Sequence, residues 1–295
     1  MKSTAFSCLR LGTLAISGLL AGAGLQPLGL AQERAERDAT VVATDTALIL
    51  GTGRSIEDAR KCFEQGARHG NTAAQVNLAM LYVHGWGVPQ NYGTALYWLK
   101  SAADRRESRA YANLGILYLN GWGVRQDYAE ALSYFRKAAD RGDTPAMVDL
   151  GYLNDYGLGT AVDHTAAAEW YRKAAEQGDP LGQNNLADLY LRGLGVPQSD
   201  ALAFAWFERA AAQGNTGARI KLGFLYANGR ATSKDPEAAY AWISAASLAG
   251  DQRGQQDLAA LESQLSPGQL ARAKRRAQEL TAAGAHPAEE VAIVR

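Results

Sequence analysis

The sequence contains only two cysteines, Cys8 and Cys62, among its 295 residues. Cys8 falls within an N-terminal segment that has the features of a cleavable export signal, so the mature chain would keep Cys62 alone. A single cysteine cannot form an intramolecular disulfide, which excludes the class of small disulfide-stapled exported domains. We therefore expect packing to supply the stability of the fold, with Cys62 as a buried structural residue.

Net charge is also lacking, because 30 basic residues balance 30 acidic ones. Without a basic field the chain has no general attraction for phosphate backbones, and we exclude nucleic acid as a partner. Hydrophobic residues make up 47% of the chain. That is enough apolar material for a sizeable core, and it argues against wholesale disorder.

The apolar run near the N-terminus, residues 11–25, is shorter than the ~20 residues that a helix needs to cross a bilayer. Lys2 and Arg10 precede it, the first acidic residue is Glu33, and Gly29 and Ala31 supply the small residues that a signal peptidase needs for cleavage after Ala31. We predict a signal peptide over residues 1–31 and a periplasmic or secreted location. An uncleaved anchor is the alternative, and it would be the only attachment to a membrane.

The four histidines do not indicate a metal or catalytic centre. His69, His84, His164 and His286 fall in different registers without paired ligand spacing, and no pattern of nucleophile and base recurs. We predict no catalytic residue, no metal ligand, no cofactor and no enzymatic activity.

The chain does contain an internal repeat of thirty-six residues. Its markers are a glycine column and a leucine column: Gly85, Gly121, Gly157, Gly193 and Gly229, and Leu78, Leu114, Leu150, Leu186, Leu222 and Leu258. A period of this length, kept without insertion, is the signature of stacked supersecondary units. Five full repeats run from about residue 71 to 250.

The spacing of apolar residues predicts two helices in each repeat. In the first helix the apolar positions share one face: Ala74, Leu78, Leu81 and Tyr82. In the second they follow an i, i+3, i+4, i+7 pattern: Ala95, Trp98, Leu99 and Ala102. One column inside the first helix admits only glycine or alanine, as at Gly115, Gly151 and Gly223. Because glycine costs a helix interior ~1 kcal/mol relative to alanine, we infer that a neighbouring aromatic ring or backbone needs that space.

The stretch "HGWGVPQNY" (residues 84–92), repeated as "NGWGVRQDY" (residues 120–128), could be a phosphate cradle or a turn between helices. Strong N-cap residues occupy the same place in all five repeats: Asn91, Asp127, Asp163, Ser199 and Asp235. A side chain that already caps the helix leaves no cradle, so we predict a turn. In the fifth repeat, Ala231 stands where the second glycine belongs.

The repeat that runs from Ala110 to Gly142, "AYANLGILYLNGWGVRQDYAEALSYFRKAADRG", resembles the Sel-one-like repeat of the tetratricopeptide repeat superfamily. The resemblance covers roughly residues 54–283. It implies an all-α fold, a right-handed α-solenoid of antiparallel helix pairs, that serves as a scaffold for protein interactions.

These observations give a predicted organisation of the chain. The segments are a signal peptide (1–31), a linker or degenerate first helix (32–53), an N-terminal half-repeat cap (54–70), five repeats (71–250), a half repeat with a C-terminal capping helix (251–283) and a tail (284–295). Ser266 and Pro267 provide the start signal of the capping helix. Its basic residues would form the polar cap that a solenoid needs for solubility.

One face of the first helices, away from the leucine stripe, varies between repeats and is the predicted partner-binding face. Its residues are a polar column (Asn77, Asn113, Asp149 and Asn185) and two variable columns (Met80, Tyr152 and Phe224; His84, Tyr156 and Arg192). The polar column would bond a partner's backbone, or else satisfy backbone and neighbouring repeats within the chain. Trp86 and Trp122 would form a partner patch on adjacent turns, or else fasten neighbouring loops together.

We therefore predict a non-catalytic adaptor of the bacterial cell envelope that binds a protein or peptide in the concave groove of the solenoid. The alternative is a binder or hydrolase of a small cell-wall-related ligand of the β-lactam type. Relatives linked to β-lactams carry a cysteine pair in each repeat, and this chain has none.

Overall fold

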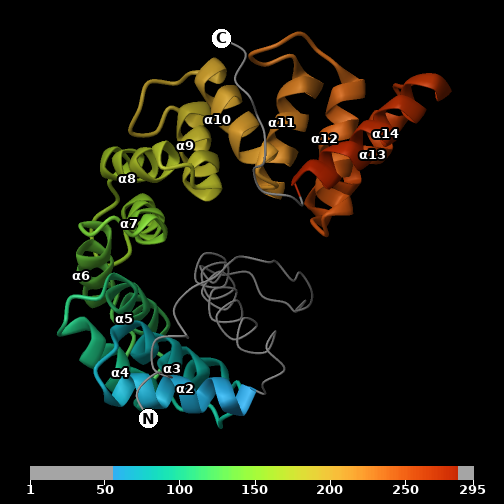
Figure 1. Ribbon diagram of the computed structural model, residues 1–295. Helices are drawn as coiled ribbons and strands as arrows, with labels where there is room; N and C mark the ends of the chain where they lie inside the picture. The colour runs from blue at the N-terminus through green and yellow to red at the C-terminus, as the bar shows by residue number, and fades with distance from the viewer. Residues whose placement is uncertain (1–55, 285–295) are drawn as a thin grey trace, which may run out of the picture. The chain divides into compact units, whose positions relative to one another are not determined.

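The computed structural model of the chain describes residues 56–284 (Figure 1). The predicted signal peptide and linker lie before this range, and the predicted tail lies almost entirely after it. Within the range the secondary structure consists of thirteen α-helices and one 3-10 turn, with no strand. The all-α class and the helix pairs predicted from the repeat are therefore confirmed.

The helices follow the repeat. The first helices are α3 (Thr72–His84), α5 (Ser108–Asn120), α7 (Thr144–Tyr156), α9 (Pro180–Arg192) and α11 (Thr216–Asn228). The second helices are α4 (Tyr92–Ala103), α6 (Tyr128–Ala139), α8 (His164–Glu176), α10 (Asp200–Ala212) and α12 (Pro236–Leu248). Before them comes α2 (Ile56–Arg68), and after them come η1 (Gln252–Gly254), α13 (Gln255–Glu262) and α14 (Pro267–Gly284).

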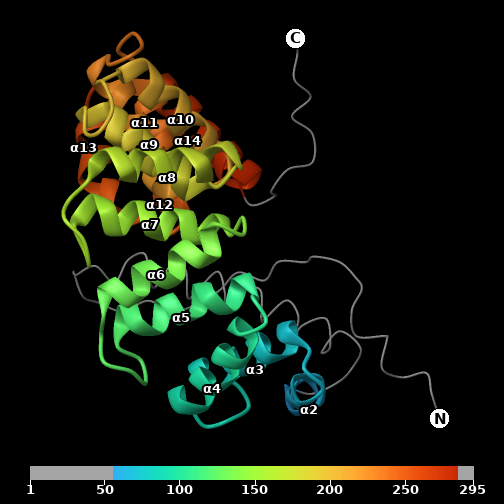
Figure 2. The same ribbon diagram turned by 90° about the vertical axis from the view of Figure 1, so that its left-hand side faces the viewer.

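The chain forms two compact bodies that divide within α7: the N-terminal body up to Asp149 and the C-terminal body from Leu150. In the N-terminal body, helices α2 to α6 pack on one another in chain order. In the C-terminal body, α8 to α12 do the same, and α12 also packs against α13 and α14 (Figure 2). Neighbours in sequence are thus neighbours in space within each body, as in stacked repeats.

The glycine loop is a turn between helices, as predicted. All five predicted N-caps accept hydrogen bonds from first-turn N–H groups: Asn91, Asp127, Asp163, Ser199 and Asp235. The glycine that ends the preceding helix takes the left-handed conformation, with φ of 72° at Gly85 and 70° at Gly121. The backbone N–H of Asn91 donates to Tyr82 O at 2.9 Å, which ties the turn to the first helix. No phosphate cradle remains at these helix starts.

Glycines inside the first helices make room for the second helices, which confirms the packing inference. A Cβ added to Gly151 would lie 2.5 Å from the Tyr171 ring, and one added to Gly115 would lie 2.5 Å from Phe135. Both distances are far below van der Waals contact. The missing side chain therefore lets an aromatic ring lie directly on the helix backbone.

The second glycine of the loop contacts the preceding repeat, which the sequence did not reveal. A Cβ added to Gly195 would lie 2.1 Å from His164 O, and one added to Gly123 would lie 2.6 Å from Tyr92 Cβ. His164 and Tyr92 each begin the second helix of the preceding repeat. In the second and fourth repeats the loop thus packs on the previous repeat through a position that has no room for a side chain.

The C-terminal helix is fixed by a buried arginine. Arg219 of α11 is 2% exposed. Its guanidinium donates to Ala211 O and Ala245 O, each at 3.3 Å, and to Leu280 O at 2.8 Å. Ser266 caps α14 as predicted, because its hydroxyl accepts from Gln269 N at 3.4 Å. Helix α14 therefore covers the last repeat through specific contacts.

Cys62 corrects one expectation. The residue is half-buried, whereas its repeat register predicted a buried position. Helix α2 is the first described helix and packs on α3. The same register is half-buried at Trp98, Tyr134 and Trp206 within the repeats, so it lies at the edge of the core and not at its centre.

Candidate functional site

The polar column is buried in the N-terminal body. Asn77 is 5% exposed and Asn113 is 3% exposed. Arg109 Nη2 donates to Asn77 Oδ1 at 3.2 Å, and Asn113 Nδ2 donates to Arg109 O at 2.8 Å. Asp149, at the end of this body, is also buried. These amides bond to the chain itself, which is the alternative that the sequence left open. Contact with a partner's backbone stays a prediction.

The same column is more accessible in the C-terminal body. Asn185 is half-buried, and its Oδ1 accepts from Asn184 Nδ2 at 3.0 Å. Lys221 takes the equivalent place on α11 and donates to Asp188 Oδ1 at 2.9 Å. On α11 this column therefore holds a charged side chain, Lys221, in place of an amide.

The variable columns also differ between the two bodies. Met80 is 3% exposed in the N-terminal body, whereas Tyr156 is 58% and Phe224 is 48% exposed in the C-terminal body. Tyr152 lies one turn before Tyr156, and the centroids of their rings are 4.4 Å apart. Exposed aromatic side chains on an ordered helix lose little entropy when a partner covers them, so they are suited to recognition.

A small charged cluster accompanies the exposed aromatic side chains. Asp188 of α9 accepts from Arg192 Nη1 at 3.1 Å, and it also holds Lys221 of α11. The hydrogen bond with Asp188 raises the pKa of the Arg192 guanidinium. Paired charges of this kind contribute more to the orientation and selectivity of an interface than to its affinity.

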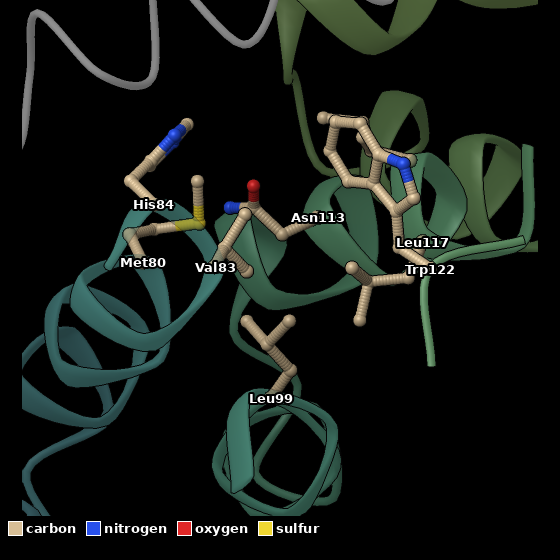
Figure 3. Close-up of a pocket in the computed structure, with 8 residues that line it drawn as sticks. Met80, Val83, His84, Leu99, Asn113, Leu117 and Trp122 are labelled. Carbon is tan, nitrogen blue, oxygen red and sulfur yellow. The ribbon is translucent and has the colours of Figure 1, made fainter. Parts of the chain in front are cut away.

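Four of the predicted residues of the N-terminal body come together at a hollow (Figure 3). It is lined by Met80, His84, Asn113 and Trp122 together with Val83, Leu99, Ile116 and Leu117. Its volume is about 10 Å³, the space of one water molecule. Ligand pockets for small molecules are usually of about 300–1,000 Å³, so the hollow is far too small for one.

His84 is the unusual member of this group. Its imidazole stacks on Trp86, with ring centroids 4.5 Å apart. Burial lowers the pKa of His84, so the ring is neutral at pH 7. Its Nε2 atom is buried and has no hydrogen-bond partner. The sequence could place His84 on this face, but it gave no sign of the unsatisfied nitrogen.

The two loop tryptophans each stack on another ring. Trp122 stacks on Tyr92 of the preceding repeat, with centroids 5.7 Å apart, and Trp86 stacks on His84. Both indoles are partly buried against the core cluster of the N-terminal body. The contact of Trp122 with Tyr92 joins neighbouring repeats, as in the fastening role that the sequence left as the alternative, whereas Trp86 contacts a residue of its own repeat. A partner patch formed by the two tryptophans stays a prediction.

In the part of the chain that the structure describes, few side chains are arranged as metal binding or catalysis would require. Between residues 56 and 284, no three His, Cys, Asp or Glu side chains converge as a metal site would require. His164 Nδ1 lies 2.7 Å from Asp155 Oδ1, a pairing that sequence spacing did not suggest. This pair joins the end of α7 to the start of α8, next to the contact with Gly195, and so has a structural role. Over the same residues, no helix combines the length and apolar character needed to cross a membrane.

Comparison with known families finds one repeat along most of the chain. The sequence profile of the Sel1 repeat matches six segments: residues 49–71, 72–106, 108–143, 144–179, 180–215 and 217–251. The last five segments follow the helix pairs described above, and the first contains α2. No curated protein matches the sequence.

Two solved structures are similar over a large part of the chain. One is c5321, a protective antigen of uropathogenic Escherichia coli with an SLR fold, at a TM-score of 0.68 and 29% identity, covering 87% of this chain. The present chain spans 57% of the length of that antigen. The other is a Sel1 repeat protein from Oxalobacter formigenes, at a TM-score of 0.60 and 34% identity, covering 64% of this chain and 76% of that one.

Proposed function

The chain belongs to the Sel1 repeat family, and on this premise we propose that it binds a protein or peptide segment along the first helices of its repeats. Sel1 repeat proteins generally mediate protein–protein interactions, and their fold is typical of non-catalytic scaffolds. The general role follows from the family. The binding face and the cellular location proposed below are specific to this chain.

The observation that carries the proposal is the exposure of Tyr156 and Phe224 on first helices of the C-terminal body. Each belongs to a helix that also carries core residues, since Leu153 is 1% and Leu225 is 2% exposed. An aromatic side chain with half of its surface in water gains most when a partner covers it. The Asp188 cluster between α9 and α11 would then select among partners by charge.

We place this activity in the bacterial cell envelope, because residues 1–31 have the features of an export signal. The test is N-terminal sequencing of the C-terminally tagged protein after cell fractionation. A periplasmic or secreted protein that begins near Gln32 supports the placement. A cytoplasmic protein that retains Met1 would contradict it.

The alternative of a small cell-wall ligand has less support. A binder or hydrolase of that type needs a deep pocket with converging polar groups. The hollow at His84 has only about 10 Å³. An exposed helix face suits an extended segment better than a compact ligand.

Capture of a partner from an envelope extract tests the binding face. We expect the double variant Tyr156→Ser and Phe224→Ser to lose the partner that the wild-type protein retains, with an unchanged melting temperature, because both side chains are exposed.

The matched control is the double variant Leu202→Ser and Leu248→Ser, which removes apolar side chains of 46% and 58% exposure from second helices of the same body. This control should retain the partner. Equal capture by both double variants would show that the first-helix face is not the binding face.

A further inference from the structure

The charged cluster at Asp188 has more hydrogen-bond donors than acceptors. Asp188 accepts one bond at each carboxylate oxygen, from Arg192 Nη1 at 3.1 Å and from Lys221 Nζ at 2.9 Å. An arginine carries five N–H donors and a lysine carries three, and neither side chain can accept a bond. Among residues 56–284, no second side chain or carbonyl bonds either cation. Most of their N–H groups are therefore left for water or for a partner.

The two cations are more accessible than the carboxylate between them. The side chains of Arg192 and Lys221 are 53% and 44% exposed, whereas that of Asp188 is 24% exposed. One negative charge is shared by two positive charges, which leaves the cluster positive. Asp155 also acts on Arg192, but its carboxylate is 11% exposed and lies against the His164 ring. A partner that approaches this face therefore meets mainly donors and positive charge.

Exposed aromatic rings lie on both sides of the cluster. Phe224 follows Lys221 by three residues on α11, so the two side chains share a face of that helix. Toward α7, Tyr156 is near enough to Arg192 to act on its charge. Phe224 is 48% and Tyr156 is 58% exposed. The donors thus lie between two apolar surfaces on first helices of the C-terminal body (Figure 1).

This arrangement limits the chemistry of the occupant. A carboxylate accepts charge-assisted bonds from an arginine and a lysine at once, and such bonds are stronger than those between neutral groups. A basic side chain would meet like charge at Arg192 and Lys221. A free phosphate ion would satisfy the donors but would leave both rings in water. A carboxylate that is attached next to apolar side chains matches the donors and the rings together.

We propose that Arg192 and Lys221 form a recognition site for an acidic side chain, aspartate or glutamate, that lies beside apolar residues in the bound protein segment. The inference rests on the proposed function, and it names the chemistry of the partner. The acid would bond both cations while its apolar neighbours cover Tyr156 and Phe224. Asp188 would hold the two cations in place, and it would also weaken their attraction for the acid because it competes for the same charges.

The test is selection of random peptides displayed on phage against the full-length protein, after removal of the phage that bind the Tyr156→Ser and Phe224→Ser double variant. We expect the selected peptides to share an aspartate or glutamate next to apolar residues. In a synthetic copy of the best peptide, replacement of that acid by its amide should weaken binding to the wild-type protein about tenfold, because charge-assisted bonds are lost. Added salt should weaken the acidic peptide more than the amide peptide.

Three variants assign the effect to the cluster. The double variant Arg192→Gln and Lys221→Gln should bind the acidic and the amide peptide equally. Asp188→Asn should bind the acidic peptide several-fold more tightly, because both cations lose a competing charge. The matched control is the double variant Lys173→Gln and Arg209→Gln, which removes two exposed cations from second helices of the same body and should bind as the wild type does. The two cluster variants should melt near the wild-type temperature, since exposed ion pairs add little stability.

The outcomes distinguish this inference from the proposed function. Selected peptides without an acid, or equal affinity for acid and amide, would overturn the acidic site and leave the scaffold function standing. Weaker binding by Asp188→Asn would do the same, since the partner would then contact the carboxylate itself. An equal loss in the control variant would trace the effect to overall charge and would also overturn the site. If no selected peptide competes with the partner captured from the envelope extract, both the site and the proposed function are overturned.

Discussion

His84 links the stability of the N-terminal body to pH. Burial lowers its pKa below the ordinary value of about 6.5, so the unfolded chain binds a proton more readily than the folded chain does. The free energy of unfolding should therefore be highest above pH 6.5 and should decrease as the pH falls below it. Urea unfolding at neutral and mildly acidic pH measures this decrease. The loss should be smaller in His84→Phe; equal losses would mean that the residue does not titrate as burial requires.

Ala231 carries a local strain that the sequence already pointed to. It occupies the place of the second loop glycine, and it retains the left-handed backbone with φ of 63°. A residue with a Cβ pays about 1 kcal/mol for this conformation, whereas glycine pays none. We expect Ala231→Gly to raise the free energy of unfolding by about 0.5–1 kcal/mol in thermal denaturation. A lower melting temperature would indicate that the Ala231 methyl makes contacts that outweigh the strain.

At the scale of residues, local chemistry was predictable and burial was not. Asn91 was recognised as an N-cap because a cap depends on its own helix. Asn77 and Asn113 were placed on the correct face, but their burial depends on side chains from the neighbouring repeat. The unsatisfied nitrogen of His84 depends in the same way on how Trp86 stacks on the ring.

At the scale of helices, the pair of Gly151 and Tyr171 tests the packing of α7 on α8. Gly151→Ala should cost about 1–3 kcal/mol, because the new Cβ would lie 2.5 Å from the Tyr171 ring. Adding Tyr171→Leu should recover part of this loss, since the equivalent positions in the first repeat are Ala79 and Leu99, both fully buried. Melting of the two single variants and the double variant measures the coupling. Additive losses would show that the two positions do not touch.

The sequence did not reveal which side chains make contacts between neighbouring repeats. Thr72 Oγ1 donates to Glu107 Oε2 at 2.7 Å, and Thr216 Oγ1 donates to Asp251 Oδ2 at 2.8 Å. Each bond joins the start of one first helix to the residue before the next. The columns that contain these residues are visible in the sequence, but periodicity alone does not say which columns meet. The packing of Gly195 on His164 was missed for the same reason.

At the scale of the whole molecule, the period of the repeat was enough to predict the fold class and the family. The apolar stripe fixes the helix pairs, and the uninterrupted spacing fixes their stacking in chain order. The accessibility of the partner face could not be predicted. The same columns are covered at Met80 and open at Tyr156 and Phe224.

The central claim is that a partner binds along the first helices. Hydrogen–deuterium exchange of the full-length protein, with and without the captured partner, tests it most directly. The account predicts slower exchange in α9 and α11, with little change in α10 and α12. Protection confined to the second helices would contradict it.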